Sequence, residues 1–139
     1  MISENALDLI ARVTSISAFT NSASFTLGGH GVDPALVKIP LPAAWVLYRG
    51  DGQKEDSDEA LVPGVGIMLS TWSVILYVPY AVQSDLLTVQ FPLLESVITT
   101  IRGKTAPSGH RWRYDGQKLV NVLPDRIAYE QRYTLTMVI

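Results

Sequence analysis

The sequence of 139 residues contains no cysteine, few charged residues and no long uninterrupted hydrophobic run. Without cysteine, disulfides and thiol chemistry are excluded, and zinc could draw only on two histidines and on carboxylates. A membrane-spanning helix needs about 20 apolar residues in a row, and polar residues, glycine or proline interrupt every run before that length. The first residues are acidic rather than basic, unlike a signal peptide. We therefore expect a cytosolic chain.

Charged residues make up only 17% of the chain, whereas 47% of its residues are hydrophobic. Such a composition argues against disorder, and at this length about two-thirds of the unfolded surface can be buried in one core. We expect one domain covering residues 1–139, with part of its apolar surface facing another chain. The formal net charge of −2 gives no general attraction to nucleic acid.

Hydrophobic spacing predicts two helices. The first covers residues 3–15, with an apolar side formed by Ala6, Leu9, Ile10, Val13 and Ile16. The second begins at Ser84 and Asp85, and Pro92 is expected to bend its axis. Its expected core stripe consists of Leu87, Phe91, Leu94, Ile98 and Ile101. The basic turn 102–104 should end it.

Strand-forming residues predict a sheet. Residues 43–48 form one strand that ends at Arg49, and residues 66–78 form a long central strand with apolar residues on both faces. Asp115 and Gly116 are predicted to be the two-residue turn of a tight hairpin, and residues 129–139 alternate as a half-buried strand. The order of helix, strands, helix and strands predicts an α+β fold, with an antiparallel or mixed β-sheet and two helices packed on one face.

None of the short motifs supports catalysis. The glycines at 28, 29 and 31 lack the spacing and the following helix of a phosphate-binding loop. His110 has no nucleophile or carboxylate partner at a diagnostic spacing. Asp56, Asp58 and Glu59 lie in a charged stretch that we expect to be a mobile loop, because the glycine and terminal glutamate of a calcium loop are missing. We predict no enzyme, no cofactor and no metal site.

Four basic residues, Arg102, Lys104, Arg111 and Arg113, lie close together in the sequence, and Trp112 and Tyr114 alternate with two of them. If the aromatic residues face the core, the arginines face outward. The stripe would then suit an acidic partner surface or a phosphate backbone. We favour a protein partner because the whole chain is acidic, and we keep a nucleic-acid-binding domain as the alternative.

The arrangement resembles the tail terminator proteins of long-tailed bacteriophages, which are small subunits with an N-terminal helix, a sheet, one long helix and a closing pair of strands. The resemblance rests on the strand 43–48, on residues 71–80 (TWSVILYVPY), on the helix that carries residues 91–94 (FPLL), and on residues 129–139 (YEQRYTLTMVI). Other neck or head-completion subunits are close alternatives.

The resemblance implies a homo-oligomer, with six copies forming a ring on the last ring of tail-tube protein. Such a ring stops tube growth and joins the tail to the head connector in the virion, after assembly in the bacterial cytoplasm. By this analogy the loop 49–63 and the predicted hairpin at Asp115 and Gly116 contact these partners. The candidate interface residues are Arg49, Asp51, Lys54, Glu55, Asp56, Asp58, Glu59, Arg102, Lys104, Arg111, Arg113, Asp115, Lys118 and Arg132. No membrane contact and no sequence-specific nucleic-acid binding are expected.

Overall fold

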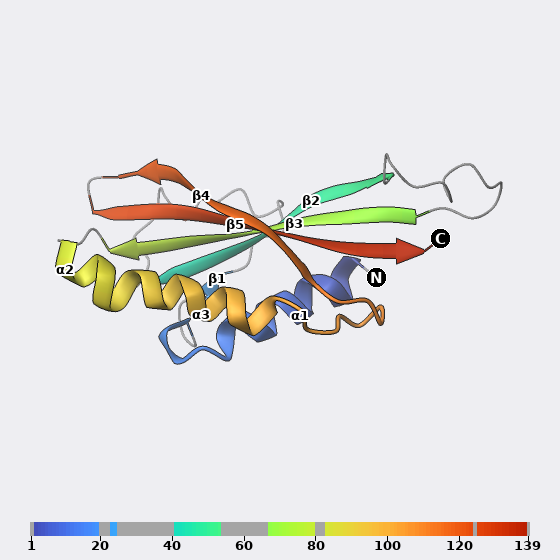
Figure 1. Cartoon of the computed structure of the whole chain (residues 1–139), viewed down its shortest axis with the longest axis horizontal. Coiled ribbons are helices and arrows are strands. Elements are labelled where there is room, and N and C mark those ends of the chain that lie inside the picture. Colours follow the sequence, from blue (N-terminus) through green and yellow to red (C-terminus); the bar gives the residue numbers. More distant parts are fainter. Residues whose placement is uncertain are drawn as a thin grey trace.

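The computed structural model describes residues 2–19, 23–24, 41–53, 67–79, 83–123 and 125–138 (Figure 1). Its helical elements are α1 (Ile2–Thr14), a 3₁₀ turn η1 (Ser17–Phe19), α2 (Gln83–Asp85), a π-helical segment η3 (Leu86–Gln90) and α3 (Phe91–Ile101). Its strands are β1 (Ala23–Ser24), β2 (Ala43–Gln53), β3 (Ile67–Pro79), β4 (Arg113–Val122) and β5 (Arg126–Val138). The first predicted helix and the central strand are confirmed to within about one residue at each end.

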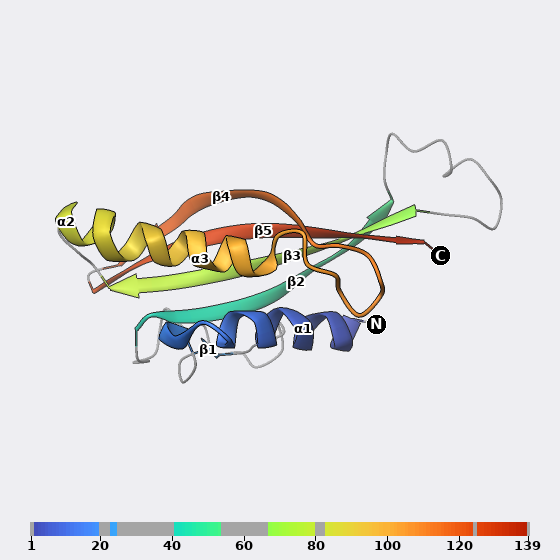
Figure 2. The same ribbon diagram turned by 60° about the horizontal axis from the view of Figure 1, so that its bottom comes forward.

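The strands form one sheet in the order β1-β2-β3-β5-β4. The pairs β2–β3, β3–β5 and β5–β4 are antiparallel, and the short β1 runs parallel to β2. Both long helices lie on the same face of this sheet (Figure 2). The α+β class and the packing of the helices on one face are therefore confirmed. We call the helix-covered side the inner face and the opposite side the outer face.

The main core lies between the inner face and the two helices. Strand alternation places Trp72, Val74 and Leu76 of β3 there, beside Tyr133 and Leu135 of β5. The helices and the segment that follows α3 contribute a second set of buried residues, namely Ala6, Leu9, Val13, Leu94, Val97, Ile101, Ala106 and Trp112. The outer face carries a smaller buried cluster of Ala43, Ile75, Tyr77 and Ala128. Apolar residues on both faces of β3 thus reflect burial on both sides, as expected for a central strand.

Trp112 joins the sheet layer to the first helix through a polar contact as well as by packing. Its ring is fully buried, and its Nε1–H donates to Asp8 Oδ2 over 2.8 Å. The same carboxylate oxygen accepts from Arg12 Nε at 3.0 Å. A buried indole N–H needs a hydrogen-bond partner, and the Asp8 carboxylate supplies it at the edge of the core.

The predicted core stripe of the second helix is wrong at its N-terminal end. Leu87 and Phe91 are exposed and Ile98 is only partly buried, whereas the inward residues Gln90, Leu94, Val97 and Ile101 step by four, three and four positions. Phe91 and Ile98 each lie one position beyond this line. Leu87 lies in the π-helical segment, in which the Phe91 N–H donates to the Leu86 carbonyl oxygen, five residues back. Such a turn contains one extra residue, so Leu87 is rotated away from the inward line. Pro92, which lacks an N–H, stands at the junction.

The predicted hairpin at Asp115 and Gly116 is also wrong. β4 runs continuously through both residues, and its pairing with β5 begins at Val122 and Ile127, next to the hydrogen bond that the Leu123 N–H donates to the Arg126 carbonyl oxygen at 2.8 Å. The register shifts between Tyr114 and Gln117, so Asp115 and Gly116 together oppose one residue of β5. This is a β-bulge, which has the same need for a glycine at positive φ as a tight turn.

The bulge yields a stability prediction. Gly116 has φ +119°, and a Cβ placed there would meet no atom within 4 Å. Gly116→Ala is therefore expected to lower the free energy of unfolding by on the order of 1 kcal/mol, through backbone strain alone. Gly52→Ala is the matched control, because Gly52 is equally unobstructed but lacks a positive φ. Equal losses in the two variants, measured by urea denaturation, would contradict a role for backbone strain.

Candidate interaction surfaces

A second β-bulge, at Arg49 in β2, lies beside a cluster of charged residues on the outer face. The sequence predicts that the strand beginning at residue 43 ends at residue 48. In the structure β2 continues to Gln53 and shifts its register between Tyr48 and Gly50. Gly50 accommodates the shift with φ +118°. Arg49 follows the outward alternation of Ala43, Trp45 and Leu47, and its side chain reaches Ser73 of β3 and Glu130 of β5 on the outer face.

Glu130 of β5 lies at the centre of this cluster and is only 3% exposed. Its Oε2 accepts a hydrogen bond from Arg49 Nη2 at 2.6 Å and another from the Ser73 hydroxyl at 2.6 Å. Arg49 Nε also donates to Ser73 Oγ at 3.0 Å. Three strands thus contribute to one closed arrangement, and together with Lys118 and Arg132 we call it the Glu130 cluster.

Lys118 and Arg132 complete the cluster but bind its carboxylate weakly. Lys118 Nζ lies 3.6 Å from Glu130 Oε1, and Arg132 Nη2 lies 3.5 Å from the same oxygen. Both distances exceed those of a good charged hydrogen bond. Their side chains are 65% and 47% exposed, respectively. The two cations therefore keep most of their hydrogen-bonding capacity for another group.

The electrostatics of Glu130 result from opposing effects. Burial favours the neutral acid and would raise the pKa of Glu130, but the hydrogen bonds from Ser73 and Arg49 and the charges of Arg49 and Arg132 outweigh it. The pKa of Glu130 is therefore lowered, and the group is ionised at neutral pH. On the inner face, burial raises the pKa of Tyr133, whose neutral hydroxyl donates to Gln131 Oε1 at 2.7 Å.

Two hollows flank Arg132 on the outer face. One, of about 220 Å³, is lined by residues 115–118, Glu130 and Arg132. The other, of about 290 Å³, is lined by residues 49–52, Thr71 and Arg132. Asp51 and Asp115 thus lie at the edges of the cluster, and Asp115 also accepts from Arg113 Nε at 2.8 Å. The cluster therefore presents exposed cations beside the two hollows.

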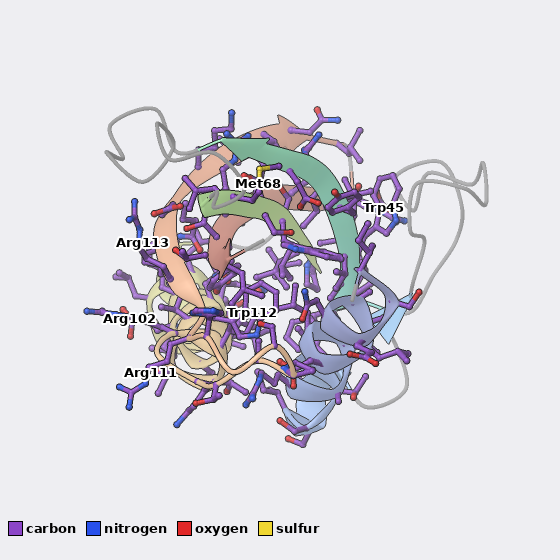
Figure 3. The ribbon with its side chains drawn as sticks, turned by 90° about the vertical axis from the view of Figure 1, so that its right-hand side faces the viewer. Trp45, Met68, Arg102, Arg111, Trp112 and Arg113 are labelled. Atoms are coloured by element: carbon purple, nitrogen blue, oxygen red, sulfur yellow. The ribbon has the colours of Figure 1, made fainter. Side chains whose placement is uncertain are left out.

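The basic stripe forms a separate surface at the start of β4. Arg102, Lys104, Arg111 and Arg113 are all exposed, and Trp112 between the last two is buried. Figure 3 shows Arg102, Arg111 and Arg113 projecting outward on one side while Trp112 lies over the core. Trp112 thus faces inward and Arg111 and Arg113 face outward, which is the condition under which the stripe was expected to suit a partner surface. Because Trp112 is buried, it offers no face on which a nucleic-acid base could stack.

Exposed apolar side chains gather at one end of the molecule. The tip of β4 and the segment that precedes α3 lie together at this end in both ribbon views (Figures 1 and 2). Their exposed large apolar residues are Leu119, Val120 and Val122 from β4, and Leu87, Val89 and Phe91 from the helical segment. Nearby, an apolar hollow of about 460 Å³ is lined by residues 16–18, Pro42, Pro79, residues 88–90 and residues 92, 93 and 96. This pattern is typical of a surface that contacts another protein.

The predicted interface residues fall into three groups. Arg49, Lys118 and Arg132 come together at the Glu130 cluster, with Asp51 and Asp115 at its edges; Arg102, Lys104, Arg111 and Arg113 form the basic stripe. Lys54, Glu55, Asp56, Asp58 and Glu59 lie outside the described residues, as do the glycines at 28, 29 and 31.

Sequence reasoning missed the two residues that organise the cluster, Glu130 and Ser73. The prediction of β5 as a half-buried strand placed Glu130 on a solvent-facing side, but Glu130 and Thr134 are both buried on the outer face. The available signal was weak: a glutamate on the polar side of β5, next to a strand whose two faces are both apolar.

No family model matches the sequence, and no curated protein matches it significantly. Within the described part of the chain, no three His, Cys, Asp or Glu side chains are grouped as metal ligands would be. Of the helices that the structure describes, none is long and apolar enough to span a membrane.

Proposed function

We propose that this chain is a structural virion protein that caps a phage tail tube as a ring, ends tube polymerisation and joins the tail to the head connector. The resemblance of its strands and long helix to tail terminators motivates the proposal. What supports it in the structure is the apolar end of the molecule, formed by the β4 tip and the segment before α3.

The β4 edge is the observation that carries the proposal. β4 is the last strand of the described sheet, and Leu119, Val120 and Val122 are exposed along it. An apolar edge strand invites pairing with another chain, and monomeric proteins usually protect such edges with charge, proline or bulges. β4 contains two register shifts, but its last residues, 119–122, carry no charge and no proline. The edge therefore suits a contact between subunits, made by backbone pairing and by apolar packing.

A ring needs two different contact surfaces on each subunit, related by a rotation that closes. The β4 edge is one candidate, and the apolar hollow beside η1 and the helical segment is a second, different surface. The basic stripe remains exposed for the tube or the connector. The nucleic-acid alternative has less support, because the aromatic residue between the arginines is buried.

The test replaces the apolar edge by charge. Leu119→Lys with Val122→Lys is expected to convert a ring-shaped oligomer into a monomer, because lysines on an edge strand oppose pairing. Light scattering on a sizing column gives the mass, and negative-stain electron microscopy shows whether rings form. Ser3→Lys with Thr99→Lys is the control, because it adds the same charge at two exposed polar positions of α1 and α3. A wild-type protein that stays monomeric and does not bind tube ends would overturn the proposal.

A further inference from the structure

We propose that the Glu130 cluster is a docking site for a carboxylate-rich segment from a second copy of this chain. The proposal rests on the proposed function, because it assigns one of the contacts between neighbouring subunits of a ring. The sequence supplies such a segment at residues 54–59, which read Lys-Glu-Asp-Ser-Asp-Glu and carry a formal charge of −3.

The cluster has spare positive charge that its own carboxylate does not neutralise. Arg49, Lys118 and Arg132 surround the single charge of Glu130, which leaves the cluster a formal net charge of +2. Asp51 and Asp115 line the hollows at its edges, and Asp115 is paired with Arg113, so the sum stays positive, at +1, when these three neighbours are included. The whole chain has a charge of −2, so everything outside the cluster sums to −4. The cluster is therefore a cationic patch on an otherwise acidic subunit, and a second copy is itself an acidic partner.

The geometry favours carboxylates as the groups received. Glu130 is buried and accepts short hydrogen bonds from Arg49 and Ser73, so it holds Arg49 in place beside the two other cations. Lys118 and Arg132 contact it only at 3.6 and 3.5 Å and are half-exposed or more. Their remaining N–H donors border the hollows on either side of Arg132. Arginine in particular presents paired donors that match a carboxylate.

Complementary charge reversal tests this contact. The cluster variant carries Lys118→Glu and Arg132→Glu, which changes the cluster from +2 to −2 while the hydrogen bonds of Glu130 to Arg49 and Ser73 remain available. The segment variant carries Glu55→Lys and Glu59→Lys, which changes the segment from −3 to +1. Each variant alone presents like charges on both surfaces, whereas a mixture of the two again pairs opposite charges.

We expect each variant alone to self-associate at least about ten-fold more weakly than the wild type, and the equimolar mixture to recover association. Association is measured by sedimentation at about 0.05 and 0.3 M salt, because exposed charges are screened at the higher ionic strength. Arg102→Glu with Arg111→Glu, an equal charge change on the basic stripe, should leave self-association unchanged. Thermal unfolding shows whether every variant is folded. If Lys118→Glu with Arg132→Glu prevents folding, Lys118→Gln with Arg132→Gln replaces it as the cluster variant.

The possible failures are distinguishable. A monomeric wild type overturns the docking site, and a monomeric wild type that also fails to bind tube ends overturns the proposed function itself. An oligomeric wild type whose association survives the reversals overturns only the docking site. A single chain that carries all four substitutions is the last case. If it recovers self-association while the mixture does not, the acidic segment contacts the cluster of its own chain, and docking between copies is overturned.

Discussion

Trp72→Ala is expected to lower the free energy of unfolding by about 3–5 kcal/mol, as is typical when a large aromatic side chain is removed from a core. Trp72 is fully buried in the middle of β3. Its ring packs against Tyr48 with centroids 4.9 Å apart and against the edge of Trp112 at 6.2 Å. Alanine leaves a cavity that strands β2 and β5 cannot close without disturbing their pairing with β3.

The loss should depend on volume more than on the indole hydrogen bond. Trp72 Nε1–H donates to Ser70 Oγ at 2.8 Å, so Trp72→Phe removes this bond while retaining most of the ring. We expect a smaller loss for phenylalanine than for alanine, because a neutral hydrogen bond contributes only about 1 kcal/mol. Guanidinium denaturation gives both values, and Leu87→Ala, at an exposed apolar position, should be nearly neutral. Equal losses in the phenylalanine and alanine variants would contradict this ranking.

Glu130→Gln is the second large change, with an expected loss of about 2–3 kcal/mol at neutral pH. The amide removes the negative charge that Arg49, Lys118 and Arg132 surround. It can also accept through only one atom, whereas the Glu130 carboxylate oxygens face Arg49 and Ser73 on one side and Lys118 and Arg132 on the other. Glu95→Gln, at an exposed position of α3, is the control and should change stability little.

This loss should depend on pH in a defined direction. The pKa of Glu130 is lower in the folded chain than in the unfolded one, so the unfolded state binds the proton more readily as the pH falls. The stabilisation is fully present above the unfolded pKa of about 4.3 and is lost as the pH falls through the lower folded value. The difference between wild type and Glu130→Gln should thus be constant from about pH 6 to 8 and shrink below about pH 4. A difference that grows on acidification would contradict a lowered pKa.

The two variants also separate folding from assembly. Trp72 lies in the core between the sheet and the helices, and its loss should weaken the fold before it affects any surface. Glu130 lies under the proposed docking site, so a folded Glu130→Gln variant would raise the cluster charge and is expected to retain or strengthen association with an acidic segment. Measuring stability and association on the same samples therefore tells a structural role from an interface role.

Local sequence was a good guide where periodicity and burial agree. The spacing of Ala6, Leu9 and Val13 predicted α1, and the apolar residues on both faces of β3 predicted a central strand. It was a poor guide where one local signal serves two structures. Asp115 and Gly116 suit a tight turn and a β-bulge equally, because both need a glycine at positive φ.

The sequence by itself determined the α+β class and the order of the main elements, because these depend on hydrophobic periods that neighbouring residues define. Only the tertiary structure decided the phase of the second helix, the inward direction of Trp112, the bulges of β2 and β4, and the burial of Glu130. Each of these depends on a partner far along the chain: Arg49 and Ser73 reach Glu130 from 81 and 57 residues away. Pairing between distant strands is set by the whole sheet, and no local pattern encodes it.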